Sequence, residues 1–547
     1  MVNFNTPPSL LFAALLLTIT SLVHGTTHPA ASSLIKSSCT TTLYPRLCHS
    51  TLSTVPLTTT TTTKDLIIIT LNKTKQTIQT NLHNINNHLT STPNLTKRTK
   101  AALHDCLELG DGTLQRLDTV IEGLKTYPNK KHVRQHADDL KTFMSTTITN
   151  KETCLEGLSQ DDNKPSKQMH KMIIKGQKHG GKMCSNVLAM IKNMTDTDMS
   201  SQGDIEMVTD EKEVRWPEWL SAGDRKLLQS GTETPNVIVA ADGSGDYTSV
   251  AAAVAAAPSK SGTRYVIKIK AGVYRENVNI PSSKTNLMFI GDGRSNTIIT
   301  ASESVAGGNT TFDSATVAAV GDGFLARDIT FQNAAGPDGN QAVALRVGSD
   351  LSAFYSCAML AYQDTLYVHS NRQFYSNCMV VGTVDFIFGN GAVVLQNCDI
   401  QPRRPNPKQK NMLTAQGRTD PNQNTGIVIQ KCRINANADL LPVQADFPTY
   451  LGRPWKLYSR TIVMQSSISD IINPAGWFPW DGEFALDTLY YREYQNTGPG
   501  ADTSKRVTWA GWGVITSASE AQSFTPGSFI AGGSWLQSTG FPYSLGL

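Results

Sequence analysis

Residues 354–398 read FYSCAMLAYQDTLYVHSNRQFYSNCMVVGTVDFIFGNGAVVLQNC and repeat one short motif, Phe354-Tyr-Ser-Cys357, Tyr375-Ser-Asn-Cys378 and Leu395-Gln-Asn-Cys398. The three cysteines follow one another at nearly equal spacing, and the step to Cys432 is longer, as an insertion would give. Related stretches flank this region: Ala326-Arg-Asp-Ile-Thr-Phe331, Ile429-Gln-Lys-Cys432 and Met464-Gln-Ser-Ser467. A unit of about 21 residues built of short strands predicts an all-β, right-handed parallel β-helix, whose equivalent positions stack about 4.8 Å apart.

The nine cysteines include no CxxC pair and no Cys/His cluster, which argues against zinc and favours disulfides. On adjacent coils two pairs could bond, with stacked free thiols as the alternative: Cys357 with Cys378, and Cys398 with Cys432. Two further pairs are expected before the repeats: Cys39 with Cys48, and Cys106 with Cys154. Cys184 is then left over, and we interpret it as a buried free thiol.

The first part of the chain has a helical pattern instead. Apolar residues recur every three to four positions, as in Ile78, Leu82, Ile85, Leu89 and again in Leu114, Leu117, Ile121, Leu124. Glycine is scarce there, and polar residues are plentiful. This pattern predicts an all-α four-helix bundle with polar outer faces.

The N-terminus has the features of an exported protein. An apolar run from Leu10 to Val23 is short for a membrane span and predicts a signal peptide, residues 1–25; an uncleaved anchor is the alternative. Four N-glycosylation sequons agree with export, beginning at Asn72, Asn94, Asn193 and Asn309.

A polar, acidic linker, residues 196–228, separates the two patterns. It ends in Arg225, Lys226, Leu227 and Leu228, a dibasic step that predicts a protease site; a solvated charge pair is the alternative. The sequence thus predicts a signal peptide at 1–25, a helical domain at 26–195, the linker, and a β-helix domain at 229–547.

Several kinds of function are excluded by composition. A net charge of +4 over 547 residues gives no basic face for nucleic acid. Ten of the 11 histidines precede residue 229, which leaves His369 alone in the β-rich domain. No GxSxG motif is present, so a Ser-His-Asp mechanism would depend on that one histidine. Carboxylates are the remaining acid–base candidates.

The repeat length brings two carboxylates together. One predicted repeat separates Asp364 from Asp385, and nearly the same step separates Gln341 from Gln363, so each pair should lie on one face of neighbouring coils. Two close carboxylates cannot both ionise easily, which gives an acid and a nucleophile or base from one residue type. The amides could donate to a developing oxyanion. Arg453 is a candidate partner that could hold a carboxylate through two hydrogen bonds.

Five segments in this order resemble the motif set of plant pectin methylesterases: Gly272-Val-Tyr274-Arg-Glu276, Gln341-Ala-Val-Ala-Leu345, Tyr362-Gln-Asp-Thr-Leu-Tyr367, Gly382-Thr-Val-Asp-Phe-Ile-Phe-Gly389 and Leu451-Gly-Arg-Pro-Trp455. The resemblance covers about Val237 to Leu547. The helical region, with Cys39, Tyr44-Pro45 and Cys48, resembles the inhibitor-like domain that precedes many of these enzymes.

The resemblance implies a role for each matching residue. Asp385 would attack the methyl-ester carbonyl, and Asp364 would protonate methanol and then activate water. Gln341 and Gln363 would stabilise the oxyanion, and Arg453 would orient Asp385. Thr311 and Trp455 would line the sugar-binding cleft, with Phe388 and Tyr367 as further walls. Gln341 and Arg453 would also bind substrate.

No metal or organic cofactor is implied. The expected partners are methyl-esterified homogalacturonan, a subtilisin-like processing protease and a pectin methylesterase inhibitor protein. The expected form is a monomer secreted to the cell wall. Two alternatives remain: a pectate lyase or polygalacturonase on the same fold, and an interaction module that carries an inactive enzyme domain.

Overall fold

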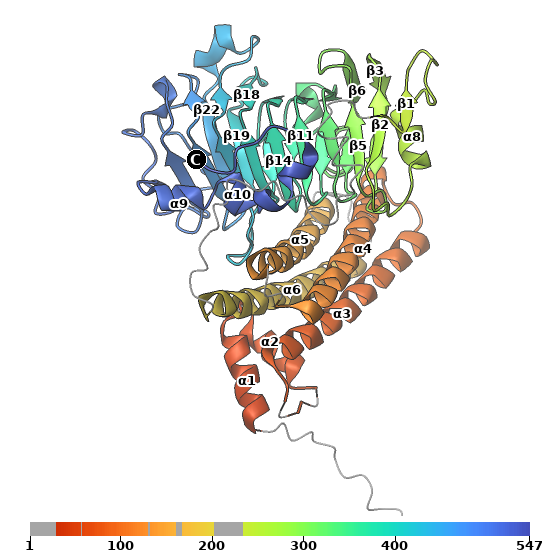
Figure 1. Ribbon diagram of the computed structural model, residues 1–547, viewed down its shortest axis with the longest axis vertical. Helices are drawn as coiled ribbons and strands as arrows, with labels where there is room; N and C mark the ends of the chain where they lie inside the picture. The colour runs from red at the N-terminus through yellow and green to blue at the C-terminus, as the bar shows by residue number, and fades with distance from the viewer. Residues whose placement is uncertain (1–28, 56, 59, 129–131, 160–166, 202–233) are drawn as a thin grey trace, which may run out of the picture.

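The computed structural model describes residues 29–55, 57–58, 60–128, 132–159, 167–201 and 234–547. These residues form a helical bundle followed by a parallel β-helix, and the bundle lies against one flank of the β-helix (Figure 1). Both predicted fold classes are therefore confirmed. The predicted signal peptide and the dibasic step at Arg225–Leu228 lie outside the described residues.

Four long helices make up the bundle, preceded by a short helical hairpin. Thr62 caps the first long helix, because its side chain accepts from the backbone of Asp65 while the Asp65 carboxylate accepts from the backbone of Thr62. The predicted apolar series lie on the inner faces, where Ile85, Leu117 and Leu124 are fully buried. The helices are α1 Pro29–Thr40, α2 Pro45–Leu52, α3 Thr63–Ser91, α4 Lys97–Thr126, α5 Val133–Ser159 and α6 Lys167–Ser201.

Two disulfides stabilise the bundle, as predicted. Cys39–Cys48 closes the α1–α2 hairpin, and Cys106–Cys154 joins α4 to α5. Cys184 is a buried free thiol. Helix α6 continues to Ser201, past residue 195 where the helical domain was expected to end. Among the described helices, none is both long and apolar enough to cross a membrane.

Three parallel sheets form the faces of the β-helix. The first sheet contains β1 Val237–Val239, β2 Tyr265–Ile269, β5 Leu287–Ile290, β8 Leu325–Arg327, β11 Ser352–Tyr355, β14 Arg372–Ser376, β17 Ala392–Gln396, β20 Gly426–Gln430, β23 Arg460–Met464, β25 Tyr490–Tyr494 and β26 Trp512–Val514. The second sheet contains β3 Gly272–Arg275, β6 Thr297–Ala301, β9 Thr330–Asn333, β12 Ala358–Leu360, β15 Met379–Gly382, β18 Asp399–Pro402, β21 Arg433–Ile434 and β24 Ser467–Ile468.

The third sheet faces the bundle and contains β4 Val278–Ile280, β7 Val317–Ala319, β10 Leu345–Val347, β13 Leu366–Tyr367, β16 Ile387–Gly389, β19 Asn411–Gln416 and β22 Thr449–Pro454. Helix α8 Val250–Ala256 lies near the first strands, and α9 Ala518–Gln522 and α10 Pro526–Phe529 follow the last (Figure 1). Short 3-10 helices complete the fold: η1 Pro337–Gly339, η2 Leu441–Asp446, η3 Pro499–Ala501, η4 Gly532–Ser534 and η5 Leu536–Thr539.

The strand register confirms the predicted coil length. Phe354 pairs with Tyr375, and Tyr375 with Leu395, so the repeated motif is one position of successive coils. The last predicted repeat was wrong by one position, because Ile429 pairs with Val463 and not with Met464. The segment between these two strands is longer than one repeat, which shifted the predicted sequence alignment by one residue. The strands themselves still pair in register.

The predicted β-helix disulfides are not formed, and this prediction was wrong. Cys357, Cys378, Cys398 and Cys432 are buried free thiols stacked inside the core. Equivalent positions of parallel coils point their Cβ atoms in the same direction, whereas a disulfide needs Cβ atoms that converge. The thiols instead contact backbone atoms, as Cys378 does with the carbonyl of Phe354 at 3.4 Å. The alternative of stacked free thiols is the observed one.

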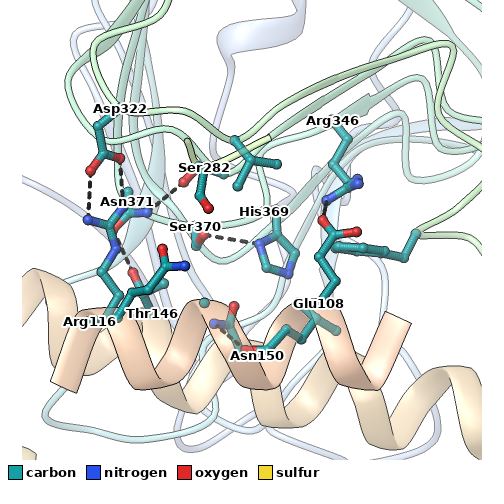
Figure 2. Close-up of a pocket in the computed structure, with 16 residues that line it drawn as sticks. Glu108, Arg116, Thr146, Asn150, Ser282, Asp322, Arg346, His369, Ser370 and Asn371 are labelled. Atoms are coloured by element: carbon teal, nitrogen blue, oxygen red, sulfur yellow. Dashed lines mark hydrogen bonds and ion pairs between the residues drawn. The ribbon is translucent and has the colours of Figure 1, made fainter. Parts of the chain in front are cut away.

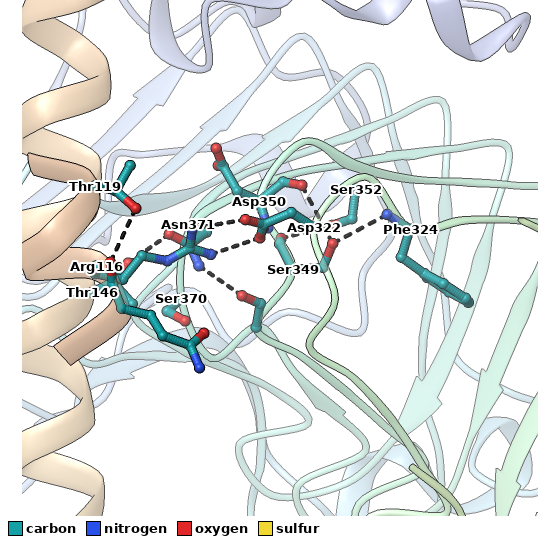
Figure 3. A network of polar contacts seen from close by, with 12 residues as sticks. Arg116, Thr119, Thr146, Asp322, Phe324, Ser349, Asp350, Ser352, Ser370 and Asn371 are labelled. Carbon is teal, nitrogen blue, oxygen red and sulfur yellow. Dashed lines mark hydrogen bonds and ion pairs between the residues drawn. The ribbon is translucent and has the colours of Figure 1, made fainter. Parts of the chain in front are cut away.

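Helices α4 and α5 cover the outer face of the third sheet. Apolar residues of both units form one cluster there, which includes Leu109, Leu158, Phe312, Tyr367 and Phe388. Ion pairs also join the two units, and Figure 3 shows the polar network around one of them, Arg116 with Asp322. Arg116 of α4 donates to both carboxylate oxygens of Asp322 at 2.7 and 2.6 Å, and Arg372 joins Asp350 to Asp139 of α5. Sequences far apart in the chain thus meet in one interface.

One face of α5 contacts the third-sheet side of the β-helix through threonine side chains. Thr142, Thr146, Thr149 and Thr153 are spaced so that they share a helix face, which we call the threonine stripe. They contact, in the same order, Asn424, Asn371, Asn390 and His369 of the β-helix at 2.9, 2.6, 2.9 and 3.0 Å. The stripe satisfies buried polar groups on both sides of the interface.

Candidate active site

Asp364 and Asp385 occupy equivalent places on neighbouring coils. Each lies just before a strand of the third sheet, and those strands pair Leu366 with Ile387. Both aspartates have a left-handed backbone, with φ of 63° and 52°, and both are 6% exposed. The tight turn before Asp385 also needs Gly382, since a Cβ there would collide with Phe386. The coil geometry therefore stacks the two carboxylates, as their spacing predicted.

Arg453 of β22 binds one of the two carboxylates directly. Its Nε and Nη2 donate to the two oxygens of Asp385 at 2.8 and 2.6 Å, the predicted bidentate contact. The guanidinium also lies over the ring of Trp480, 4.3 Å from its centroid. Trp480 had not been predicted, although the aromatic run Trp477-Phe-Pro-Trp480 was visible in the sequence.

The environments of the two carboxylates differ. Burial raises the pKa of Asp364 well above its usual range, and the neighbouring charge of Asp385 raises it further. Burial also raises the pKa of Asp385, but the hydrogen bonds and charge of Arg453 make this rise smaller. Asp364 thus holds a proton more firmly, and Asp385 is the better candidate for the ionised form.

Gln341 and Gln363 lie beside this pair. The backbone N–H of Ala342 donates to the carbonyl of Gln363 at 3.2 Å, which puts the two glutamines on adjacent coils. Both residues are half-buried, and their side-chain amides are neutral hydrogen-bond donors.

Aromatic rings form the wall next to the carboxylates. Tyr367 stacks on Phe388 with ring centroids 4.2 Å apart, and Phe388 meets Trp455 edge-on at 5.9 Å. These three residues and Thr311 line one small cavity, together with Thr153, Glu156 and Gly157 of α5. The predicted cleft residues are therefore together, and the bundle occupies the space in front of them.

Glu156 of α5 is a bundle residue that affects the carboxylate pair. Burial raises the pKa of Glu156 to about 7, and the charge of Lys456 opposes that rise. The negative charge of Glu156 in turn contributes to the raised pKa of Asp364. Helix α5 thus brings a third carboxyl group toward the site, which the sequence pattern had not indicated.

His369 does not complete a Ser-His-Asp arrangement. Its Nδ1 lies 3.0 Å from the Oγ of Ser370, and its Nε2 contacts Thr153 where such an arrangement requires a carboxylate. Burial, and to a lesser degree the charge of Arg346, lower the pKa of His369 to about 3. The geometry supports the carboxylate pair instead. Within the described residues, no group of three or more His, Cys, Asp or Glu is placed to hold a metal ion.

Comparison with known proteins agrees with this site. Residues 236–533 match the Pectinesterase family, and residues 33–190 match the family described as Plant invertase/pectin methylesterase inhibitor. The chain belongs to the pectinesterase family. It is therefore a carboxylic ester hydrolase, a pectin methylesterase by family, and it carries an inhibitor-like helical domain.

Relatives and a solved structure show how the two parts occur elsewhere. The chain is 62% identical to pectinesterase/pectinesterase inhibitor U1 of Solanum lycopersicum, over 95% of this chain and 90% of that relative. It is 63% identical to pectinesterase 3 of Citrus sinensis, over 94% and 88%. The solved pectin methylesterase from carrot is 76% identical, with a TM-score of 0.57, and covers 58% of this chain and 99% of its own. A β-helix of this kind thus exists as a protein without the bundle.

Proposed function

We propose that this pectinesterase hydrolyses the methyl esters of homogalacturonan at the Asp364–Asp385 pair through an aspartyl acyl-enzyme. The observation that carries the proposal is the bidentate contact of Arg453 with Asp385 beside an Asp364 whose pKa is raised by burial. One carboxylate is held ionised and oriented for attack, and the other can keep a proton for the leaving group.

The reaction then follows in two steps. A carboxylate oxygen of Asp385 attacks the ester carbonyl carbon, and Gln341 and Gln363 donate hydrogen bonds to the resulting oxyanion. The C–O bond to the methoxy group breaks as Asp364 gives its proton, which releases methanol. Asp364 then takes a proton from water, the hydroxide attacks the acyl carbon, and free galacturonate and Asp385 are restored.

The cleft residues bind the sugar chain in this proposal. The stacked rings of Tyr367 and Phe388, with Trp455 edge-on, offer apolar faces for pyranose rings. Thr311 adds a polar group to the same wall. In the uncut chain α5 fills this space, so we expect little activity until the bundle separates.

Export and processing complete the proposed pathway. A signal peptide at 1–25 and three exposed sequons, at Asn72, Asn94 and Asn193, support secretion to the cell wall. Asn309 is buried, which opposes a glycan there while the bundle is docked. We propose that a subtilisin-like protease cuts after Arg225–Leu228 and releases residues 229–547 as a monomer, which a separate inhibitor protein of the bundle class can bind.

A methanol assay tests the function and the role of the bundle together. The full chain and the 229–547 fragment are incubated with highly methyl-esterified pectin, and methanol and chain length are both measured. We expect methanol without chain shortening, with the fragment at least about tenfold faster than the uncut chain. Chain shortening would point to a lyase or polygalacturonase, and no methanol from a folded fragment would refute the esterase proposal.

A further inference from the structure

The two carboxylates of the proposed site lie at the ends of two stacked turns. We call residues 362–364 the Asp364 turn and residues 383–385, on the next coil, the Asp385 turn. The N–H of Asp364 donates to the carbonyl of Val384 at 3.1 Å, which joins one turn to the other. Both aspartates have a left-handed backbone, a conformation that a residue other than glycine keeps only where the surrounding structure holds it. The geometry of the site therefore depends on what fixes these turns.

Arg403, the residue after strand β18, contacts both turns. Its backbone N–H donates to the carbonyl of Gly382, directly before the second of these turns, at 2.8 Å. Its guanidinium lies 3.9 Å from the ring centroid of Tyr362, and its Nη1 donates to the carbonyl of Ala361 at 3.3 Å. Because β18 pairs with β15 and β15 with β12, this side chain reaches back over a whole coil. One residue thus bridges from one turn to the other.

Asp439 fixes the direction of the Arg403 side chain. Nε and Nη2 of Arg403 both lie 3.1 Å from Oδ2 of Asp439, and Oδ1 of Asp439 accepts from the backbone N–H of Arg404 at 3.0 Å. The side chains of Arg403 and Asp439 are 24% and 36% exposed, so solvent screens this ion pair. Its removal should therefore change the local geometry without unfolding the β-helix.

The bundle does not take part in these contacts. The cavity between the two units lies around Asn150 of α5 and His369 of the β-helix (Figure 2), whereas every contact of Arg403 given above is with a residue of the β-helix. The groups that hold Arg403 therefore stay with it when the bundle separates.

We propose that Arg403 is a positioning residue, which holds the Asp364 turn against the Asp385 turn. The inference rests on the proposed function and adds to it a residue that acts through Tyr362 and the backbone. The amide of Gln363 and the proton of Asp364 must come within hydrogen-bond reach of the ester, and a displacement of about 1 Å costs much of the rate. Loosening the turn should therefore lower kcat, whereas KM should change little because the aromatic wall for the sugar lies on strands of the third sheet.

The test compares the 229–547 fragment with its Arg403→Ala variant. The solved carrot relative, which matches this part of the chain, supports the use of the fragment. On methyl-esterified galacturonate oligomers we expect kcat to fall about tenfold while KM changes by less than about twofold. On esters of more acidic alcohols, which need less protonation by Asp364, the loss of kcat should be only about threefold. A merely structural defect would lower the rate on all esters equally.

Three further variants make the result specific. Tyr362→Leu should show the same pattern, and the double variant should lose little more than either single variant, because both changes remove one contact. Arg403→Lys, which keeps a positive charge for the ring, should recover part of kcat. Arg433→Ala is the matched control, because Arg433 forms an ion pair with Asp399 on the second sheet and should keep the wild-type kinetics.

Two outcomes would overturn the inference. One is a folded Arg403→Ala fragment with the wild-type kcat, and the other is an equal loss of kcat on every ester. If Arg403→Ala does not fold, Asp439→Ala decides, since it removes the anchor of the guanidinium at a more exposed position. Wild-type kinetics on the whole ester series in that variant contradict the proposal. A wild-type fragment that releases no methanol refutes the proposed function instead, so the two failures can be told apart.

Discussion

At the scale of single residues, the proposed chemistry depends on the unequal surroundings of two identical side chains. Asp385 is held by Arg453, whereas Asp364 has burial and a neighbouring negative charge. The pair is comparable to other sites in which two carboxyl groups take different protonation states because their environments differ. Exchanging either aspartate for asparagine keeps the shape and removes one function.

Asp385→Asn should lower kcat for methanol release by at least about 10³-fold in the 229–547 fragment, because the nucleophile is lost. Circular dichroism and thermal unfolding should be nearly unchanged. Asp399→Asn, an outward-facing aspartate of β18, is the matched control and should keep full activity. Substantial methanol release by a verified Asp385→Asn preparation would remove Asp385 from the nucleophile role.

Asp364→Asn should also be severely impaired, but its loss should depend on the leaving group. An activated ester needs less protonation of the departing oxygen, so residual turnover should favour such esters over methyl esters. Rates on a series of galacturonate esters with increasingly acidic alcohols would measure this. Equal losses across the series would contradict the assignment of Asp364 as the general acid.

The residues of the site could be predicted because the coil is periodic. A regular repeat turns sequence spacing into spatial proximity, so Asp364, Asp385 and both glutamines were placed by counting. Arg453 could be proposed as the partner of a carboxylate from its chemistry and motif. Trp480 could not be predicted, because its importance comes from its ring contact with Arg453, and no repeat marks that position.

At the scale of elements, the interface between α4, α5 and the third sheet covers the proposed cleft. Its Arg116–Asp322 ion pair is partly exposed, whereas the threonine stripe is buried. Removing a partly exposed contact should therefore loosen the docking without unfolding either unit.

Arg116→Glu in the full chain should place a carboxylate against Asp322 and weaken the docking. The Arg116 side chain is 15% exposed and that of Asp322 is 42% exposed, so solvent screens part of the repulsion. We expect the esterase activity of the uncut chain to rise about tenfold toward that of the fragment. Lys125→Glu, at an exposed position of the same helix, is the control. No rise in activity would show that the docking does not depend on this pair.

The elements themselves were largely predictable, but their docking was not. The spacing of apolar residues predicted the helices, and the repeated motif predicted the strands. The regular cysteine spacing led to a wrong prediction of disulfides in the β-helix, because proximity alone does not satisfy disulfide geometry. The fit of α5 against the third sheet depends on side chains that are far apart in the chain, such as Thr153 and His369, and no local pattern records it.

At the scale of the whole molecule, pH should control how firmly the bundle is docked. Burial raises the pKa of Asp105 to about 7, with smaller opposing contributions from Thr310 and Arg346 and reinforcing ones from Asp313 and Glu108. Burial raises the pKa of Glu156 to about 7 in the same way. After separation these groups return toward ordinary values near 4. Docking is then fully favoured below about pH 4 and weakens as pH rises toward 7.

The lowered pKa of His369 makes docking of the bundle more favourable at higher pH, which opposes the effect of Asp105 and Glu156. One such group does not reverse the combined effect of those two. Its pKa is lowered to about 3 in the docked form. The stabilisation of docking by neutral His369 is therefore lost as pH falls below about 6.5, the ordinary pKa of the separated form. The ratio of full-chain to fragment activity, which cancels the pH dependence of the chemistry, should therefore rise about tenfold between pH 5 and pH 7.5. The double variant Asp105→Asn, Glu156→Gln should flatten this rise, and Glu122→Gln should not. A flat ratio in the wild-type chain would contradict the prediction.

The order of the two domains along the chain also determines which of them is synthesised first. The ribosome completes residues 29–201 before it begins the first strand at Val237, and domains generally fold as units from the N-terminus during synthesis. The threonine stripe is therefore in place while the coils that it contacts are still being made. Each new coil of the third sheet can settle against a finished helical surface, so we expect the cleft to be assembled already covered and, under the proposed processing, to meet solvent only when the bundle leaves.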